Sequence, residues 1–224
     1  MISLCLLLFF VLPLYTVLSG EASLGRDFRT ADRSSTGMAP RPDQTPEAVV
    51  QIYYARALNW RGIFGVHTWI ATKPENAAEY TIHQVIGWRL FRGLPVVVSA
   101  PGTPDGRWFG DRPRVVVDVQ GKEAERLIPK IEAAVKDYRF ANAGDYRVWP
   151  GPNSNTFTAT VMRAVPELST ALPSNAIGRD FRPLPYAGLS DSGTGVEASL
   201  WGLVGVKLGW VEGVEVNLLG LVAG

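Results

Sequence analysis

The chain contains very few of the side chains that most often build catalytic and metal centres. Cysteine occurs once in 224 residues, at Cys5, and histidine occurs twice, at His67 and His83. A single cysteine excludes a disulfide within the chain and leaves no cysteine nucleophile outside the N-terminal apolar run. So few cysteines and histidines also argue against a Cys/His zinc site, and we expect neither a metal nor another cofactor.

An excess of charge of either sign is missing as well. The net charge is +1, and 46% of the residues are hydrophobic while 19% are charged. Without a basic cluster, the sequence gives no support to nucleic acid as a partner. The composition is that of a globular protein, and the length allows one domain with a real core plus appendages.

The longest apolar stretch covers residues 2–18 (ISLCLLLFFVLPLYTVL) and carries no charge. As a helix it would measure about 26 Å, just short of the hydrocarbon core of a bilayer. It is either a secretory signal peptide or an uncleaved anchor, and the first is weakened because no Lys or Arg precedes it. Arg26, Arg29 and Arg33 follow it, and the positive-inside rule would keep that flank in the cytoplasm. We expect the lipid bilayer as a partner through this segment.

The chain divides into four parts. Residues 1–20 form the anchor or signal segment and residues 21–44 a polar linker, which we expect to be extended or poorly ordered. Residues 45–190 form the domain, and residues 191–224 a glycine-rich, apolar C-terminal hairpin. The hairpin joins either the sheet of the domain, a membrane surface or a partner.

The predicted elements indicate an α+β domain: a small antiparallel sheet packed by two or three helices. The Thr45-Pro-Glu start and apolar residues at helical spacing predict a first helix, ending near Asn59. A second helix is predicted over residues 122–138, where Pro129 should cause a kink or mark the true start, and a third begins near Ser154. Strands are predicted at residues 64–73, 79–91, 94–100, 115–119, 204–210 and 214–221.

Ser154 is the candidate nucleophile. It stands between Asn153 and Asn155 in WPGPNSNTF (residues 149–157), at a Pro/Gly loop that opens the third helix. A hydroxyl there meets the positive end of the helix dipole, which favours developing negative charge. Serine needs a base within hydrogen-bond reach, and His67 is the natural one, so we expect the two side chains within about 4 Å of each other.

A third group usually orients the imidazole of such a pair. Alternation along the second strand places Gln84 on an otherwise apolar face, where its amide needs a hydrogen-bond partner, so Gln84 is preferred. His83 lies on the other face and is the second choice. Each residue also has a structural explanation: the serine and asparagines as a helix cap, His67 as a core histidine, and the tryptophans as core.

Three blocks of sequence, HTWI (residues 67–70), VIGW (residues 85–88) and WPGPNSNTF, resemble a bacterial family of unknown function. The resemblance covers about residues 30–224. More distantly, the order of parts resembles the circularly permuted papain-like hydrolases and acyltransferases, among them cell-wall peptidases and relatives of lecithin–retinol acyltransferase. This resemblance implies a permuted papain-like fold, with His67 as base, Gln84 or His83 as orienting residue and Ser154 at the nucleophile position. Trp149, Asn153, Asn155 and His83 would then contact substrate.

The resemblance has one departure, because Ser154 stands where those enzymes carry cysteine, whose thiolate forms far more easily than an alkoxide. Two functions follow. The first is a serine-variant hydrolase or acyltransferase acting on an amide or ester of the cell envelope, with backbone N–H groups near Asn155 as oxyanion donors. The second is a non-catalytic binding or structural module of the membrane surface that uses the same cleft or the C-terminal hairpin. Both imply a membrane-anchored protein, at the bacterial inner membrane with a slight preference for the periplasmic side.

Overall fold

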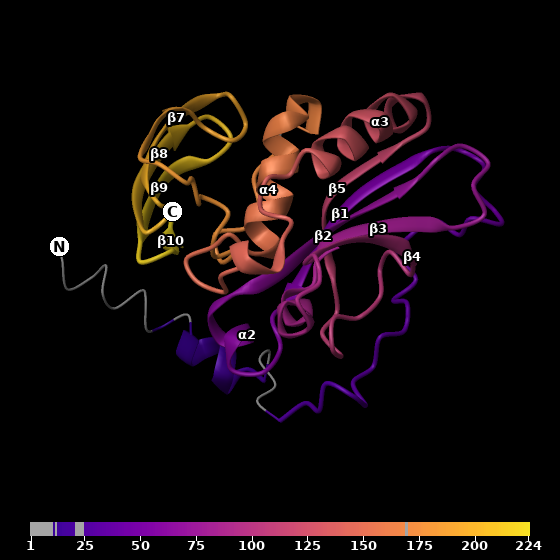
Figure 1. The fold of residues 1–224 in the computed structure, drawn as a ribbon, viewed down its shortest axis with the longest axis horizontal. Helices are drawn as coiled ribbons and strands as arrows, with labels where there is room; N and C mark the ends of the chain where they lie inside the picture. The colour runs from indigo at the N-terminus through magenta and orange to yellow at the C-terminus, as the bar shows by residue number, and fades with distance from the viewer. Residues whose placement is uncertain (1–10, 12, 21–24, 169) are drawn as a thin grey trace.

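The computed structural model of the protein describes residues 11, 13–20, 25–168 and 170–224. It contains two five-stranded antiparallel sheets (Figure 1). The central sheet has the strand order β4-β3-β2-β1-β5, and the C-terminal sheet has the order β10-β9-β8-β7-β6. With helices packed against the central sheet, the α+β class and its antiparallel pairing are confirmed.

The first strand, β1 (Val49–Arg56), is where the sequence prediction is wrong. We expected a helix here, but β1 lies between β2 (Val66–Lys73) and β5 (Arg114–Gln120) in the central sheet. Both of its faces are buried, so its apolar residues form a nearly continuous run instead of alternating with polar ones. Such a run contains helical spacings by accident, and its β-branched and aromatic residues favour the strand.

The next two strands are displaced from the predicted bounds. β3 is Tyr80–Val85, followed by the 3-10 helix η1 (Gly87–Arg92) instead of more strand, and β4 is Val97–Gly102. Gly87 is pressed against the ring of Tyr146, since a Cβ there would lie 2.4 Å from Tyr146 Cζ. That close approach is only available to glycine, and the chain leaves the sheet at this point.

One face of the central sheet is covered by α3 (Lys122–Lys136) and α4 (Ser154–Ala164), while the one-turn α2 (Arg61–Phe64) connects β1 to β2 (Figure 1). α3 begins before Pro129, so the proline does not mark its start. The larger core lies between these helices and the sheet. Among its fully buried members are Val50, Ile52, Ile70, Ile131, Phe157 and Val161.

The opposite face of the central sheet is covered by residues 25–46, most of which we expected to be a linker. Asp105 holds this segment, because its carboxylate accepts hydrogen bonds from Ser35 Oγ (2.8 Å) and Met38 N (2.7 Å). Met38 also packs against the smaller core on this face, and Tyr80 Oη donates to Pro40 O over 2.8 Å. These residues form turns at 28–30 and 42–44 with irregular backbone between them, and they complete the domain.

The C-terminal sheet is larger than the predicted hairpin. β8 (Val204–Gly209) and β9 (Gly213–Leu218) do pair as a hairpin, and β10 (Leu221–Ala223) continues from β9. On the other side, β7 (Gly195–Leu200) and β6 (Tyr186–Leu189) extend it to five strands. This sheet is separate from the central one, so the first of the three alternatives, a hairpin on the sheet of the domain, is wrong.

An ion-pair network fastens the inward face of the C-terminal sheet to the rest of the molecule. Lys207 Nζ on β8 lies 2.5 Å from Asp180 Oδ1 and 2.6 Å from Asp191 Oδ2. Asp191 also accepts from Arg163 of α4 over 3.0 Å. As many acidic as basic side chains take part, so each buried cation has an acidic partner. The members are Arg163, Arg179, Arg182, Lys207, Asp180, Asp191, Glu197 and Glu215.

The predicted anchor lies mostly outside the described residues, which leave out residues 2–10 and 12 of that run. Residues 13–18 are helical, and Leu14, Tyr15 and Leu18 are exposed. In the part of the chain that the structure describes, no helix combines the length and the apolar character needed to cross a bilayer.

The network generates a prediction about pH. Burial raises the pKa of Glu197 from 4.5 to about 7, against the opposing effect of Lys207 and Arg182, and its Oε1 has no partner among the described residues. The folded state therefore holds a proton that the unfolded state releases, and stability falls as pH rises from about 4.5 to 7. As the pH rises from 4.5 to 8, the free energy of unfolding of the parent should fall. In Glu197→Gln the fall over the same range should be smaller, by on the order of 2 kcal/mol. Urea denaturation across that range measures this.

Glu132→Gln on the exposed side of α3 is the matched control and should keep the parental pH profile. An unchanged slope in Glu197→Gln would show that Glu197 is ionised throughout and that its bond to Arg182 outweighs burial.

Candidate functional site

The candidate site lies at the start of α4, and its cap is Asn153. Asn153 Oδ1 accepts hydrogen bonds from Asn155 N (2.9 Å) and Thr156 N (3.2 Å), and Thr156 Oγ1 accepts from Asn153 N (3.1 Å). This reciprocal arrangement is a capping box. Ser154 is therefore the first residue of the helix and not its cap.

The amides of the two asparagines bind the loop that leads to the C-terminal sheet. Asn153 Nδ2 and Asn155 Nδ2 both donate to Ile177 O, over 3.0 and 2.8 Å. Thr156 Oγ1 donates to Gly178 O over 2.7 Å. Gly178 has a positive φ of 94°, and a Cβ there would lie 2.6 Å from Asn153 Nδ2, so only glycine allows this approach. The polar residues of WPGPNSNTF thus serve a structural contact.

Trp149, at the other end of the motif, contacts the C-terminal sheet directly. Its Nε1 donates to Leu219 O, in the turn between β9 and β10, over 2.9 Å. Of the residues that we expected to bind substrate, Trp149, Asn153 and Asn155 all have partners inside the protein.

Ser154 itself is nearly buried, with 9% of its surface exposed. Its carbonyl oxygen lies 3.2 Å from Thr68 Oγ1, which is also 2.9 Å from Thr158 Oγ1. Within the described residues, the Ser154 hydroxyl has no hydrogen-bond partner. The side chain that β2 presents to this end of α4 is therefore a threonine.

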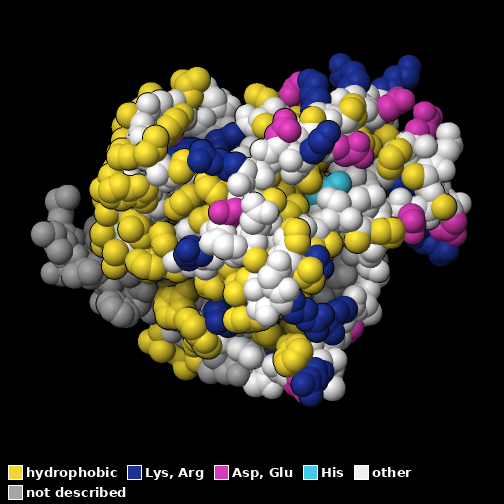
Figure 2. Space-filling view, viewed as in Figure 1, with side chains coloured by type: hydrophobic (Ala, Val, Ile, Leu, Met, Phe, Trp, Pro, Cys, Tyr) yellow, Lys and Arg dark blue, Asp and Glu magenta, His cyan; other side chains and the backbone are white. Residues whose placement is uncertain are grey.

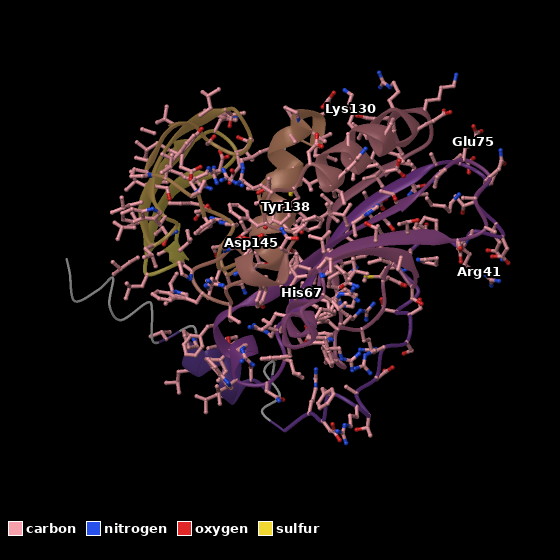
Figure 3. All side chains as sticks on the ribbon, in the orientation of Figure 1. Arg41, His67, Glu75, Lys130, Tyr138 and Asp145 are labelled. Atoms are coloured by element: carbon pink, nitrogen blue, oxygen red, sulfur yellow. The ribbon has the colours of Figure 1, made fainter. Side chains whose placement is uncertain are left out.

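His67 points to the other face of the central sheet. Its ring stacks on Trp108 at a centroid distance of 3.7 Å and an angle of 11°, and Trp69 lies on the same side. Figure 3 shows His67 below β2, whereas Tyr138 of the larger core lies above it. Because successive side chains of a strand alternate between faces, Thr68 can meet α4 only if His67 does not.

The expected His67–Gln84 contact is present, at 3.3 Å between Nε2 and Oε1, but the expected contact of His67 with Ser154 is not formed: no hydrogen bond joins them in the described part of the chain. Burial lowers the pKa of His67 to about 3, an effect that the bond to Gln84 only partly offsets. His67 is a neutral, stacked core histidine.

His83, our second choice, faces the helices but interacts with other partners. Its Nε2 lies 3.1 Å from Thr72 Oγ1 and its Nδ1 2.8 Å from Ser99 Oγ. Burial lowers its pKa to about 4. Sequence reasoning missed Thr72 and Ser99, although the register of neighbouring strands, had it been known, would have placed Ser99 directly opposite His83.

Acidic residues provide no alternative centre in the regions that the structure describes, where no group of His, Cys, Asp and Glu has the arrangement of a metal site. Asp105 is occupied by the N-terminal segment. Although burial raises its pKa, the hydrogen bonds from Ser35, Met38 and Ala39 outweigh this and lower the pKa overall.

Comparison with known proteins identifies a family model that matches the chain. Residues 47–181 match the model of a family described as "Protein of unknown function (DUF3750)", a narrower span than the resemblance suggested. No curated protein and no solved structure matches the chain. The matched span contains both histidines and Ser154, and it ends at Phe181, before the first strand of the C-terminal sheet.

The capping geometry predicts unequal effects of two neighbouring substitutions. Asn153→Ala removes the cap and the amide bond to Ile177, and we expect it to cost about 1–3 kcal/mol of stability. Ser154→Ala removes a hydroxyl without a partner and should stay within about 0.5 kcal/mol of the parent. Urea unfolding of both variants measures the difference. An equal or larger loss of stability for Ser154→Ala would contradict this prediction and show that the Ser154 hydroxyl makes a stabilising interaction.

The placement of His67 predicts the reactivity of a thiol at position 154. In a Cys5→Ser background, Ser154→Cys should react with iodoacetamide at the same rate, within about twofold, with and without His67→Gln, because the imidazole is on the other face of β2. The measurement is the alkylation rate near neutral pH. A large rate loss in the double variant would restore the Ser154–His67 pair.

Proposed function

We propose that this chain, which belongs to the DUF3750 family of unknown function, is a binding module that lies on a membrane surface through its C-terminal sheet. The observation that carries this proposal is the polarity of that sheet. Its charged and polar residues face inward, and its apolar residues face outward.

The outward face is a grid of aliphatic side chains. Across β7, β8 and β9, one row pairs Val196 with Leu208 and Leu208 with Val214, and the next pairs Ala198 with Val206 and Val206 with Val216. The third row is Leu200, Val204 and Leu218. Figure 2 shows hydrophobic side chains gathered over this sheet at the left of the view. The exposed members are Val196, Leu200, Val204, Val206, Leu208, Val214, Val216 and Leu218.

Inward residues of the same strands follow the opposite rule. Glu197, Lys207 and Glu215 are directly paired across the strands, and Asn217 donates to Asp180 over 3.1 Å. A monomeric protein in water is expected to arrange such a sheet the other way round. Since an apolar face of this extent normally marks an interaction site, the outward face needs an apolar partner.

A lipid surface suits the face better than a protein surface does. The outward side chains of β7, β8 and β9 offer no charge and no hydrogen-bonding group, whereas a protein interface usually has about one hydrogen bond per 100–200 Å². Hydrocarbon requires neither. Tryptophans lie at both ends of the sheet, Trp201 in the β7–β8 turn and Trp210 in the β8–β9 turn, where Trp210 is 93% exposed. Tryptophan is enriched at membrane interfaces.

The depth of insertion is limited by the backbone of the sheet. β6 and β10 are outer strands, with unpaired N–H and C=O groups that lose hydrogen bonds to water if they enter hydrocarbon. The sheet would therefore lie flat at the level of the headgroups and upper acyl chains. The apolar run of residues 2–18 would hold the same chain at the same surface, and Figure 1 shows residues 13–20 toward the same side of the view as β10.

A hydrolase centred on Ser154 is the weaker candidate. Serine needs a base to become a nucleophile. The neighbours that the structure gives Ser154 are Thr68 and the cap residues, and the amides beside it are used by the 175–179 loop.

The proposal predicts that Trp210 contacts lipid. In the full-length protein reconstituted into phosphatidylcholine vesicles with brominated acyl chains, bromine should quench Trp210, whose signal is the difference between the parent and Trp210→Phe. Val206→Glu at the centre of the face should remove most of this quenching, because a carboxylate there must stay hydrated. Fluorescence with bromines at successive chain depths measures both effects.

The matched control is Trp88, which is half exposed on the 3-10 helix η1 beside the central sheet. Its signal is the difference in fluorescence between the parent and Trp88→Phe. Quenching of Trp210 no stronger than that of Trp88 would contradict the proposal. A doubled mass in solution with Trp210 already shielded would instead assign the face to a second copy of the chain.

A further inference from the structure

Three side chains on β2, β3 and β4 form a continuous hydrogen-bonded chain on the helix side of the central sheet. Thr72 Oγ1 lies 3.1 Å from His83 Nε2, and His83 Nδ1 lies 2.8 Å from Ser99 Oγ. His83 is 3% exposed, whereas Ser99 is exposed to solvent. A buried imidazole thus contacts the hydroxyl of a solvent-exposed residue.

The donors and acceptors in this series of hydrogen bonds follow from the chemistry of the three side chains. A neutral imidazole has one N–H donor and one bare nitrogen, and a hydroxyl can serve as either partner. With the proton on Nε2, His83 donates to Thr72 Oγ1, and its bare Nδ1 accepts from Ser99 Oγ–H. Burial lowers the pKa of His83 to about 4, so the ring stays neutral and able to accept near neutral pH.

The backbone of Ser99 is also free on one side. β4 is an outer strand, and Ile86 N donates to Val96 O over 2.8 Å, while Val96 N donates to Ala141 O. The first of these bonds flanks the pair Val85–Val97, so Gln84 and Val98 form the next hydrogen-bonded pair. Because such pairs alternate in an antiparallel ladder, His83 and Ser99 form a non-hydrogen-bonded pair. The N–H and C=O of Ser99 then point away from the sheet. Pro101, which has no N–H, occupies an equivalent outward position.

We propose that Ser99 is a nucleophile, served by His83 as its proton acceptor, toward acyl esters presented as an extended chain along the outer edge of β4. The outward-pointing N–H and C=O groups of Val97 and Ser99 would pair with such a chain as an added strand does. The Ser99 N–H, beside its own hydroxyl, is the donor available to an oxyanion.

The reaction is an acyl transfer. Ser99 Oγ attacks the carbonyl carbon, a C–O bond forms, and the hydroxyl proton passes to His83 Nδ1. The bond to the alcohol then breaks, and the alcohol leaves with that proton. Water hydrolyses the acyl group from Ser99 and restores the hydroxyl, so that the ester and water give an acid and an alcohol.

Thr72, the third residue of the hydrogen-bonded series, determines which class of substrate is expected. Thr72 is neutral, so it orients the imidazole without stabilising the imidazolium as a carboxylate would. Burial also makes His83 a weak base. Esters with good leaving groups require less from such a base than amides do, and we assign Ser99 to esters.

The test is labelling of the full-length protein with a fluorophosphonate probe, mapped by mass spectrometry. Ser99 Oγ should displace fluoride from phosphorus, with its proton going to His83. We expect Ser99 to be modified at least about tenfold faster than Ser174, an exposed loop serine of the same chain. Ser99→Ala should abolish this modification, and p-nitrophenyl acetate should acetylate Ser99 in the parent.

Two further variants separate activation from accessibility. His83→Asn should reduce the labelling rate of Ser99 to that of Ser174, provided that the near-ultraviolet circular dichroism shows an intact fold. Thr72→Val keeps the histidine and should lower the rate severalfold, so it decides the question where His83→Asn does not fold. Labelling of Ser99 no faster than Ser174, or a rate that Thr72→Val leaves unchanged, overturns the proposal. Neither result bears on membrane binding, because the C-terminal sheet is not involved.

Discussion

The fold depends on the contact between the start of α4 and the loop at residues 175–179. Asn153 and Thr156 cap the helix, and together with Asn155 they bind the carbonyls of Ile177 and Gly178. That loop continues directly into Arg179 and Asp180, which enter the ion-pair network. One polar turn therefore fixes both the helix on the central sheet and the point at which the C-terminal sheet is attached.

The ion-pair network and the apolar outward face of the C-terminal sheet are two consequences of one alternation. Side chains along a strand alternate between the two faces, so a strand that places Lys207 inward must place Val206 and Leu208 outward. Burying balanced charges gives little net stability by itself, because desolvation offsets attraction. The arrangement gains its main benefit where the outward face is also covered, as it would be in the membrane-bound state that we propose.

How far the sequence could predict the fold depends on where the signal was local. The Asn-Ser-Asn turn and the apolar stripe of α3 mark helices through neighbouring residues, and both helices are present. β1 was mistaken because burial on both faces removes the alternation that identifies a strand. The candidate site failed for a non-local reason. Whether the side chains of His67 and Ser154 meet depends on which face of β2 packs against α4. The sequence does not specify this face, and the contact of Thr68 with Ser154 shows that it is the one without His67.

The same reasoning explains why Ser99 was overlooked and what distinguishes it from Ser154. A serine at a helix start is conspicuous in sequence, but its surroundings here consist of caps and a threonine. A serine in an outer strand is inconspicuous, yet the register between β3 and β4 places it opposite the one histidine whose ring nitrogens both meet hydroxyls. Chemistry depends on the acceptor beside a hydroxyl more than on the helix dipole behind it, because a proton must leave before oxygen can attack. By that criterion Ser99, and not Ser154, is the position at which this domain has the means to react.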